Sequence, residues 1–182
     1  MPGGGPSAEL DAWVLATAPR AVAYARSLLR DRHAADDVVQ DCYCRLLEKA
    51  AVYDLPRDGL RLLLRAITNA CINYRTRRKP LLRLVWMDET GGEGNDDPPD
   101  RAAVPPELNL LHQELRDAVA AGLLTLLPQQ RAALELKSIG HSQLEIGEIL
   151  GVTPANAGVL VYRARQALAA YLAPLLGGEA VS

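Results

Sequence analysis

The sequence predicts an all-α protein made of two small helical domains joined by a flexible acidic linker. Hydrophobic residues make up 49% of the 182-residue chain but aromatic residues only 4%, and Phe is absent. Its cores must therefore consist of Leu, Ala, Val and Ile, which favours helices. Residues 87–106 contain six acids, four Pro and three Gly with almost no apolar pattern, a composition typical of flexible linkers. We expect domains over residues 7–84 and 107–175 and a linker over 85–106.

Apolar residues recur at helical intervals in the N-terminal half. The first helix is expected over residues 10–29, kinked or split at Pro19. Its inner stripe comprises Val22, Ala25, Leu28 and Leu29. The next helix has a one-sided apolar face formed by Val38, Val39, Cys42, Tyr43, Leu46 and Leu47. Its outer face carries Asp37, Gln40, Asp41, Arg45 and Glu48, a pattern that ordinary solvated helices share.

A third helix is expected over residues 58–78, with a polar and basic row opposite its apolar stripe. The stripe comprises Leu60, Leu63, Leu64, Ile67, Cys71 and Tyr74. The row comprises Arg61, Arg65, Asn69, Asn73, Arg75, Arg77, Arg78 and Lys79. Guanidinium and amide groups in such a row suit phosphates and unstacked bases. The net charge is only −2, but residues 57–83 hold eight cations against one acid, so the distribution favours a nucleic-acid partner.

Residues 127–168 have the pattern of a helix-turn-helix unit. The residues expected to begin or end its helices are Pro128, Gly140, Ser142 with Glu145, Gly151, Thr153 and Pro154. They match a first-turn Pro, a capping box and an N-cap Thr. The residues expected to face inward are Leu144, Ile146, Ile149, Leu150, Ala157, Val161, Ala164 and Leu168. In DNA-binding proteins the second helix of such a unit enters the major groove, although plain helical bundles contain similar turns.

A further helix precedes this unit and is expected to pack beneath it. Its apolar residues are Leu108, Leu111, Leu115, Ala118, Val119 and Leu126. The segment 127–165 also contains an ordered set of residues: Leu127, Pro128, Arg131, Ser142, Glu145, Ile146, Leu150, Gly151, Val152, Tyr162, Arg163, Ala164 and Arg165. This set resembles the promoter-reading C-terminal domain of sigma factors, nearest the extracytoplasmic-function group of the sigma-70 family. The resemblance implies a transcription initiation factor that binds core RNA polymerase, directs it to specific promoters and helps to open the DNA.

The N-terminal half carries a second resemblance to the same family. Residues 35–41, followed by Tyr43, resemble the segment that docks on the coiled-coil clamp of core RNA polymerase. That resemblance implies polymerase contacts by Asp37, Gln40, Asp41 and Arg45. Residues 63–75 match less closely the segment that melts the minus-ten element and holds the non-template strand, which implies that the row on the third helix binds this DNA. The match departs at Leu62, where a Trp is usual, and at Asn73, where an Asp is usual.

By the same resemblance the C-terminal domain reads the minus-thirty-five element. The residues assigned to this role are Arg131, Lys137, Ser142, Thr153, Ala155, Asn156, Arg163 and Arg165. No cation lies between Lys137 and Arg163, and Asn156 is the one polar side chain in the first two turns of the third helix of the unit. Phosphate anchoring must come from the four cations and from helix N-terminal amides. We expect weak DNA binding by this domain alone, with affinity arising from two tethered domains held on polymerase.

Other function classes find no support in the sequence. The three histidines are scattered and no nucleophile–base pair converges by spacing, so we expect no enzyme, cofactor, metal site or small-molecule substrate. Cys42, Cys44 and Cys71 lack metal-ligand spacing and are expected to be buried thiols in a reducing cytoplasm. No apolar run is long enough to span a membrane and no signal peptide is visible, so we expect a cytoplasmic protein without membrane insertion.

Two alternatives remain open. A stand-alone helix-turn-helix regulator would leave the polar face between Asp37 and Arg45 unexplained. A sigma-derived protein-interaction module with weakened DNA binding is favoured by the neutral stretch 155–160. The resemblance further implies an anti-sigma partner that covers the polymerase-binding faces. The acidic linker either serves solubility alone or, as the resemblance implies, follows the path of nucleic acid inside polymerase.

Overall fold

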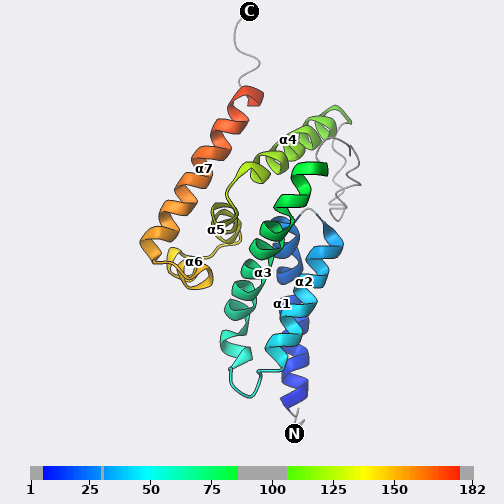
Figure 1. Cartoon of the computed structure of the whole chain (residues 1–182), viewed down its shortest axis with the longest axis vertical. Helices are drawn as coiled ribbons and strands as arrows, with labels where there is room; N and C mark the ends of the chain where they lie inside the picture. Colours follow the sequence, from blue (N-terminus) through cyan, green and yellow to red (C-terminus); the bar gives the residue numbers. More distant parts are fainter. Residues whose placement is uncertain (1–5, 30, 86–105, 177–182) are drawn as a thin grey trace, which may run out of the picture.

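The computed structural model describes residues 6–29, 31–85 and 106–176 (Figure 1). These residues form helices α1 (Pro6–Leu28), α2 (Arg32–Leu47), α3 (Leu55–Val85), α4 (Pro106–Thr125), α5 (Pro128–Ser138), α6 (Gln143–Leu150) and α7 (Pro154–Leu176). No strand occurs among them, and the predicted all-α fold is confirmed. The predicted linker lies almost wholly outside the described residues.

Helices α1, α2 and α3 pack together into the N-terminal domain (Figure 1). The side chains with no more than 1% exposure include Ala21, Ala25, Leu55, Leu63, Leu64, Ile67 and Cys71. Asp31 caps α2 by accepting a hydrogen bond from the Ala34 amide at 3.0 Å. Buried polar groups join the helices, since the Tyr24 and Thr68 hydroxyls lie 2.8 Å apart. The helices therefore have a tightly packed core whose buried hydroxyls are satisfied.

The C-terminal domain contains the predicted helix-turn-helix in α5, α6 and α7, and α4 packs on α7. The capping box is present: Glu145 and Ser142 exchange hydrogen bonds at the start of α6. Gly151 ends α6 with φ +70°, a left-handed conformation that glycine adopts without steric cost. Gly147 allows the next turn to approach closely, because a Cβ there would lie 2.8 Å from the Val152 carbonyl oxygen. These residues fix the angle between α6 and α7.

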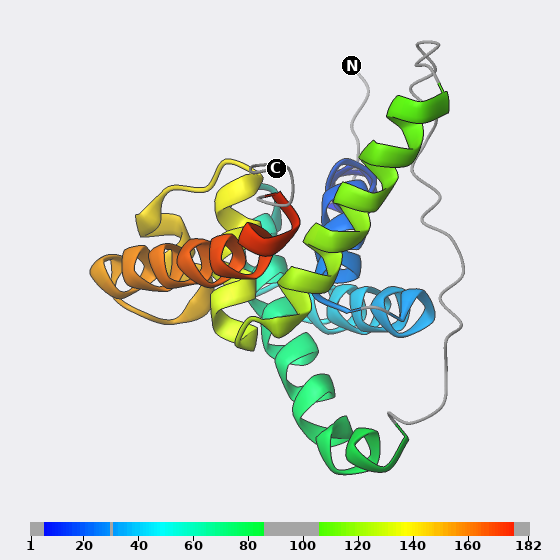
Figure 2. The same ribbon diagram turned by 90° about the horizontal axis from the view of Figure 1, so that it is seen from above.

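The two domains contact each other directly. Helix α6 packs against α3, and α5 packs against α1 and α3. In both views α3 lies between α7 on one side and α2 on the other (Figures 1 and 2). Buried apolar residues of both domains belong to one continuous cluster. The sequence predicts two lobes on a flexible linker, and the structure adds an interface between them.

Some expectations about single residues are wrong. Of the kink or split expected at Pro19, the split does not occur, because Pro19 lies inside the single helix α1, and the kink stays a prediction. Cys44 is exposed, whereas Cys42 and Cys71 are buried as predicted. Leu144 is 58% exposed because Ile146 and Ile149 occupy the inner face of the short helix α6. Helix α3 extends beyond the predicted end at residue 78.

Among the described helices, none on its own has the length and apolar content needed to cross a membrane. Only α6 together with Pro154–Leu175, a pair bent by 97°, passes that test, and only by length and composition.

Candidate protein-docking and nucleic-acid interfaces

The outer face of α2 presents the polar residues that the sequence singles out. Asp37, Gln40, Asp41 and Arg45 are all exposed. The Arg45 guanidinium pairs with the Asp41 carboxylate, with Nη2 2.7 Å from Oδ2 and Nε 3.1 Å from Oδ1. Exposed pairs of this kind contribute no more than about 1 kcal/mol. Both side chains are therefore able to rearrange when a partner protein approaches.

An acidic groove runs beside this face. Its lining residues are Asp31, His33, Ala34, Asp37, Val38, Asp41 and Tyr74. Asp31 is held there as the N-cap of α2 and by the Tyr74 hydroxyl, which donates to it at 3.5 Å. Asp31 and Tyr74 are groove residues that the sequence patterns do not single out, although an Asp before a helical run is a recognisable N-cap signal. Three carboxylates in one groove suit a cationic side chain of a protein partner.

A salt bridge between α1 and α2 positions the docking face. The Arg26 guanidinium donates to both oxygens of the Asp36 carboxylate, at 2.8 and 3.1 Å. The hydrogen bond from Arg26 lowers the pKa of Asp36, and the same bond raises the pKa of Arg26. Asp36 thus ties α2 to α1, which leaves its neighbour Asp37 on the groove side.

The polar row predicted on α3 is exposed where the structure describes its side chains. Arg61, Arg65, Asn69 and Asn73 all lie at the surface. The structure does not describe the side chains of the other predicted members of the row, Arg75, Arg77, Arg78 and Lys79. The four described residues repeat every fourth position, so they share one side of α3.

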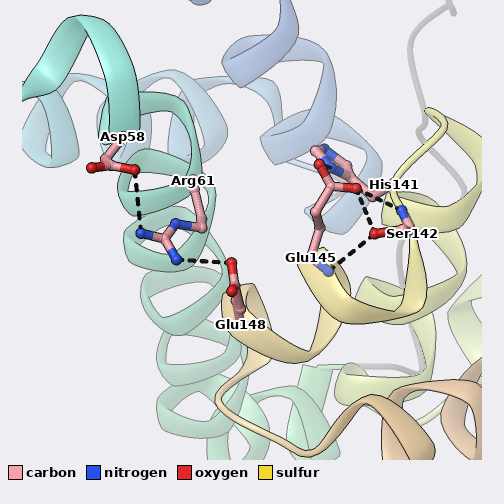
Figure 3. Close-up of polar contacts among 6 residues, drawn as sticks. All are labelled: Asp58, Arg61, His141, Ser142, Glu145 and Glu148. Atoms are coloured by element: carbon pink, nitrogen blue, oxygen red, sulfur yellow. Dashed lines mark hydrogen bonds and ion pairs between the residues drawn. The ribbon is translucent and has the colours of Figure 1, made fainter.

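Arg61 is already engaged by two carboxylates (Figure 3). Its Nη1 lies 2.8 Å from Glu148 Oε2 on α6, and its Nη2 lies 3.5 Å from Asp58 Oδ1 on α3. The hydrogen bond to Glu148 raises the pKa of Arg61. The neighbouring Arg65 guanidinium approaches the end of α6, since a Cβ built on Gly151 would lie 3.7 Å from its Nη2. In this arrangement α6 lies against the start of the row.

Most residues assigned to the minus-thirty-five element lie at the surface of the C-terminal domain. The exposed ones are Ser142, Thr153, Ala155, Asn156, Arg163 and Arg165. Lys137 is half-buried, and its Nζ donates to the His141 carbonyl oxygen at 3.4 Å. Arg131 differs from the rest: it is only 5% exposed and its Nη2 donates to the Ser27 carbonyl oxygen on α1. Its predicted role therefore requires that α5 move away from α1.

The Ser142 backbone amide at the start of α6 already has a hydrogen-bond partner within the protein. The Ser142 amide and hydroxyl both donate to Glu145 Oε2 at 2.8 Å, and the Glu145 amide donates to the Ser142 hydroxyl at 3.3 Å (Figure 3). The hydrogen bond from the Ser142 backbone is the largest cause that lowers the pKa of Glu145. Thr153 likewise accepts from the Asn156 amide, at 3.2 Å, at the start of α7. Phosphate binding at the predicted Ser142 amide would have to displace Glu145.

No group of three His, Cys, Asp or Glu side chains with metal-binding geometry occurs among residues 6–29, 31–85 and 106–176.

Comparisons with known proteins match both domains. Residues 13–80 match the family model for sigma-70 region 2, and residues 116–168 match the model for sigma-70 region 4. This chain belongs to the extracytoplasmic-function group of the sigma-70 family. Both matches fall inside the two predicted domain ranges, whose outer bounds stay predictions. The sigma factor is accordingly a transcription initiation factor that directs RNA polymerase to promoters, and its family is not a family of enzymes.

Two individual proteins illustrate the relationship. The sigma factor is 29% identical over 144 residues to the ECF RNA polymerase sigma factor SigW of Bacillus subtilis strain 168, covering 78% of this chain and 76% of the relative. Its fold resembles that of the sigma factor RpoE from Bartonella quintana, solved in complex with the anti-sigma factor NepR. That similarity has a TM-score of 0.61 and covers 87% of this chain and 93% of the other. Because the identity is only 20%, it supports the fold alone.

Proposed function

We propose that the sigma factor docks on core RNA polymerase through the outer face of α2 and the acidic groove beside it. The observation that carries this proposal is the exposed set Asp37, Gln40, Asp41 and Arg45, which lies within the region 2 match. A face that serves only solvation has no need of a groove lined by three carboxylates. Charge complementarity at such a surface speeds association and suppresses wrong partners.

The row on α3 holds the minus-ten DNA in this proposal. Arg61 and Arg65 supply phosphate contacts, and Asn69 and Asn73 present amides that can hydrogen-bond to unstacked bases. The predicted basic cluster that follows, Arg75, Arg77, Arg78 and Lys79, extends the same path along the chain. The dense positive charge of this segment contrasts with the nearly neutral C-terminal domain, so most of the electrostatic attraction for DNA comes from α3.

The start of α7 reads the minus-thirty-five element in this proposal, with few direct base contacts. Asn156 is exposed in the first turn and can bond to a base edge, while Arg163 and Arg165 are exposed further along the same helix. Ala155 leaves room for close approach of the backbone. With so few cations the domain alone binds weakly, and tethering on polymerase supplies the remaining affinity.

We also propose regulation by an anti-sigma protein. The solved relative was captured with the anti-sigma factor NepR. In this chain five large apolar side chains are exposed on α6 and α7: Leu144 at 58%, Val159 at 43%, Tyr162 at 64%, Tyr171 at 39% and Leu175 at 60%. Exposed apolar side chains of this size are typical of protein-interaction surfaces. The same observation favours the second candidate function, a sigma-derived interaction module, which would bind proteins and produce no specific transcription start.

Binding to purified core RNA polymerase tests the docking proposal. We expect the double variant Asp37→Arg, Asp41→Arg to bind at least about tenfold more weakly, because it reverses the charge of the groove. The matched control is Glu114→Arg, which changes an exposed glutamate on α4 to the same residue and should bind like the parent. Circular dichroism establishes that each variant is folded. Parent-like binding by the double variant would refute the docking face.

A further inference from the structure

We propose that Gln143, at the start of α6, is a base-reading residue, and that it forms with the start of α7 a face that selects A·T base pairs. This role rests on the one proposed for α7 at the minus-thirty-five element. It adds a residue from the other helix of the helix-turn-helix and names the bases that the two helices recognise together.

A gap on the flank of α7 admits the Gln143 side chain. Gly158 has no side chain, and a Cβ built there would lie 3.0 Å from Gln143 Nε2 and 3.5 Å from its Oε1. The Gln143 amide therefore takes the space that a side chain at position 158 would fill. Gln143 is exposed, and its amide has no hydrogen-bond partner among the described residues. Both polar atoms of this amide are thus available beside α7.

The exposed face of α7 next to this amide is apolar. Ala155, Val159 and Tyr162 are exposed and follow one another at intervals of four and three residues, so they share one side of the helix. Ala157 and Val161 are buried on the other side. The second helix of a helix-turn-helix enters the major groove with its N-terminal residues toward the base edges. This exposed side is therefore the one that meets the bases.

The side chains of this face fit A·T pairs. In the major groove glutamine and asparagine bond to N6 and N7 of adenine, and apolar side chains contact the thymine methyl group. Guanine is read by arginine or lysine and cytosine by glutamate or aspartate, and residues 154–161 contain none of these four. Gln143 and Asn156 supply the amides, and Val159 supplies methyl groups. The first cation of α7, Arg163, comes only in its third turn.

Contact with a phosphate is the competing role for Gln143. Amide side chains often bond to the DNA backbone, and such contacts carry no sequence information. The Gln143 amide, however, lies against the second turn of α7, at position 158. Because α7 is the helix that enters the groove, an amide held against this turn is placed toward the base edges.

Base analogues in the minus-thirty-five element test the role of Gln143. The complex of this chain with core RNA polymerase is titrated with promoter DNA that it selects from random-sequence templates. Replacing adenine by 7-deazaadenine removes the N7 acceptor and keeps base pairing. At one position this should weaken binding by the parent about fivefold. Gln143→Ala should bind both DNAs equally, whereas Gln113→Ala, which removes an exposed glutamine on α4, should discriminate like the parent.

Gly158→Ala supplies a second variant that keeps Gln143. Its added methyl group would lie 3.0 Å from the Gln143 amide and would displace it, while the exposed amide can move without disturbing the core. This variant should stay folded by circular dichroism and lose the same discrimination against 7-deazaadenine. A role of Gln143 that is only structural predicts no such loss.

Uracil in place of thymine tests the apolar part of the face, because uracil lacks the methyl group. At one position it should weaken binding by the parent about fourfold, the value of one buried methyl group. Val159→Ala should reduce that effect. Equal binding of uracil and thymine DNA at every position would overturn the selection of thymine and leave Val159 to a protein partner.

Gln143→Ala that weakens binding equally on every sequence would overturn the base-reading role, because loss of a phosphate contact acts in this way. A parent that ignores 7-deazaadenine, or a selected element made of G·C pairs alone, would also overturn it. Transversions across the element separate this failure from failure of α7. If they weaken binding while the analogues do not, α7 keeps its proposed role; if they have no effect, both proposals fail. The α2 face is intact in every variant, so the docking proposal is tested independently.

Discussion

At the scale of single residues, Ser142 and Glu145 determine where the second helix of the helix-turn-helix begins. The hydrogen bonds they exchange satisfy amide groups that no intrahelical carbonyl can reach. Because the bonds favour the ionised carboxylate, they lower the pKa of Glu145 below its ordinary value of 4.5. A lowered pKa in the folded state means that ionised Glu145 stabilises the fold above about pH 4.5, and that this contribution is lost as the pH falls further.

Comparison of the parent with Glu145→Gln across pH tests this effect. Glutamine keeps the capping hydrogen bonds but carries no charge. By urea unfolding, the parent should be the more stable protein at pH 7, and the gap should shrink as the pH falls below about 4.5. Glu114→Gln, which removes a carboxylate from the exposed side of α4, is the matched control. A gap that stays constant from pH 7 to pH 3 would show that the charge of Glu145 contributes nothing.

Sequence reasoning finds residues whose role is local and misses those whose role depends on distant segments. The capping box, the Pro at the start of α5 and the glycine that ends α6 are all readable from spacing, and the structure contains each of them. Arg131 is different, because its contact with Ser27 joins residues 104 positions apart. Nothing near Arg131 in the sequence distinguishes an arginine for phosphate from an arginine for a helix C-terminus.

At the scale of elements, the approach of α3 to α1 depends on Gly59. Alanine in place of a helical glycine ordinarily stabilises a helix by about 1 kcal/mol. Here a Cβ would lie 2.7 Å from Cζ2 of Trp13, a ring that also packs edge-on against Tyr43. We predict that Gly59→Ala destabilises the protein by about 1–3 kcal/mol, the usual cost of overpacking a core.

Gly158→Ala is the matched control for this prediction. Its Cβ would meet only the end of the Gln143 side chain, at 3.0 Å, and Gln143 is exposed and able to move. Urea unfolding should therefore find Gly158→Ala equal to or more stable than the parent. If Gly59→Ala were as stable as Gly158→Ala, the close approach of α1 and α3 at Trp13 would be wrong.

Periodicity predicts the existence of helices well and their outer limits poorly. The apolar stripes of α2 and α3 identify both helices, but α3 continues beyond the last residue of its stripe. The buried face of a short helix is harder to predict from the sequence, as Leu144 shows. Helix α6 has only 8 residues, so Ile146 and Ile149 fill its inner side and leave the first leucine outside. Periodicity over two turns cannot distinguish these positions.

At the scale of the whole molecule, the interface between the domains could not be predicted from the sequence. The acidic, Pro- and Gly-rich composition of the linker predicts that the domains are tethered, and a tether carries no information about contact between them. Their contact depends on how the surfaces of α3 and α6 complement each other. It includes one pair, Arg61 with Glu148, whose members are 87 positions apart. The resemblance of the motifs identifies each domain separately and leaves their arrangement open.

The central claim is that this chain programs core RNA polymerase through the α2 face. Docking through the α2 face, and the promoter-specific initiation that depends on it, are tested most directly by reconstituted transcription with core polymerase on random-sequence templates, followed by mapping of the start sites. We predict that the parent and Glu114→Arg direct transcription from the same specific set of starts. Asp37→Arg with Asp41→Arg should lose those starts, because the groove that docks on polymerase carries the wrong charge. The same start sites at the same level with this double variant would contradict the account.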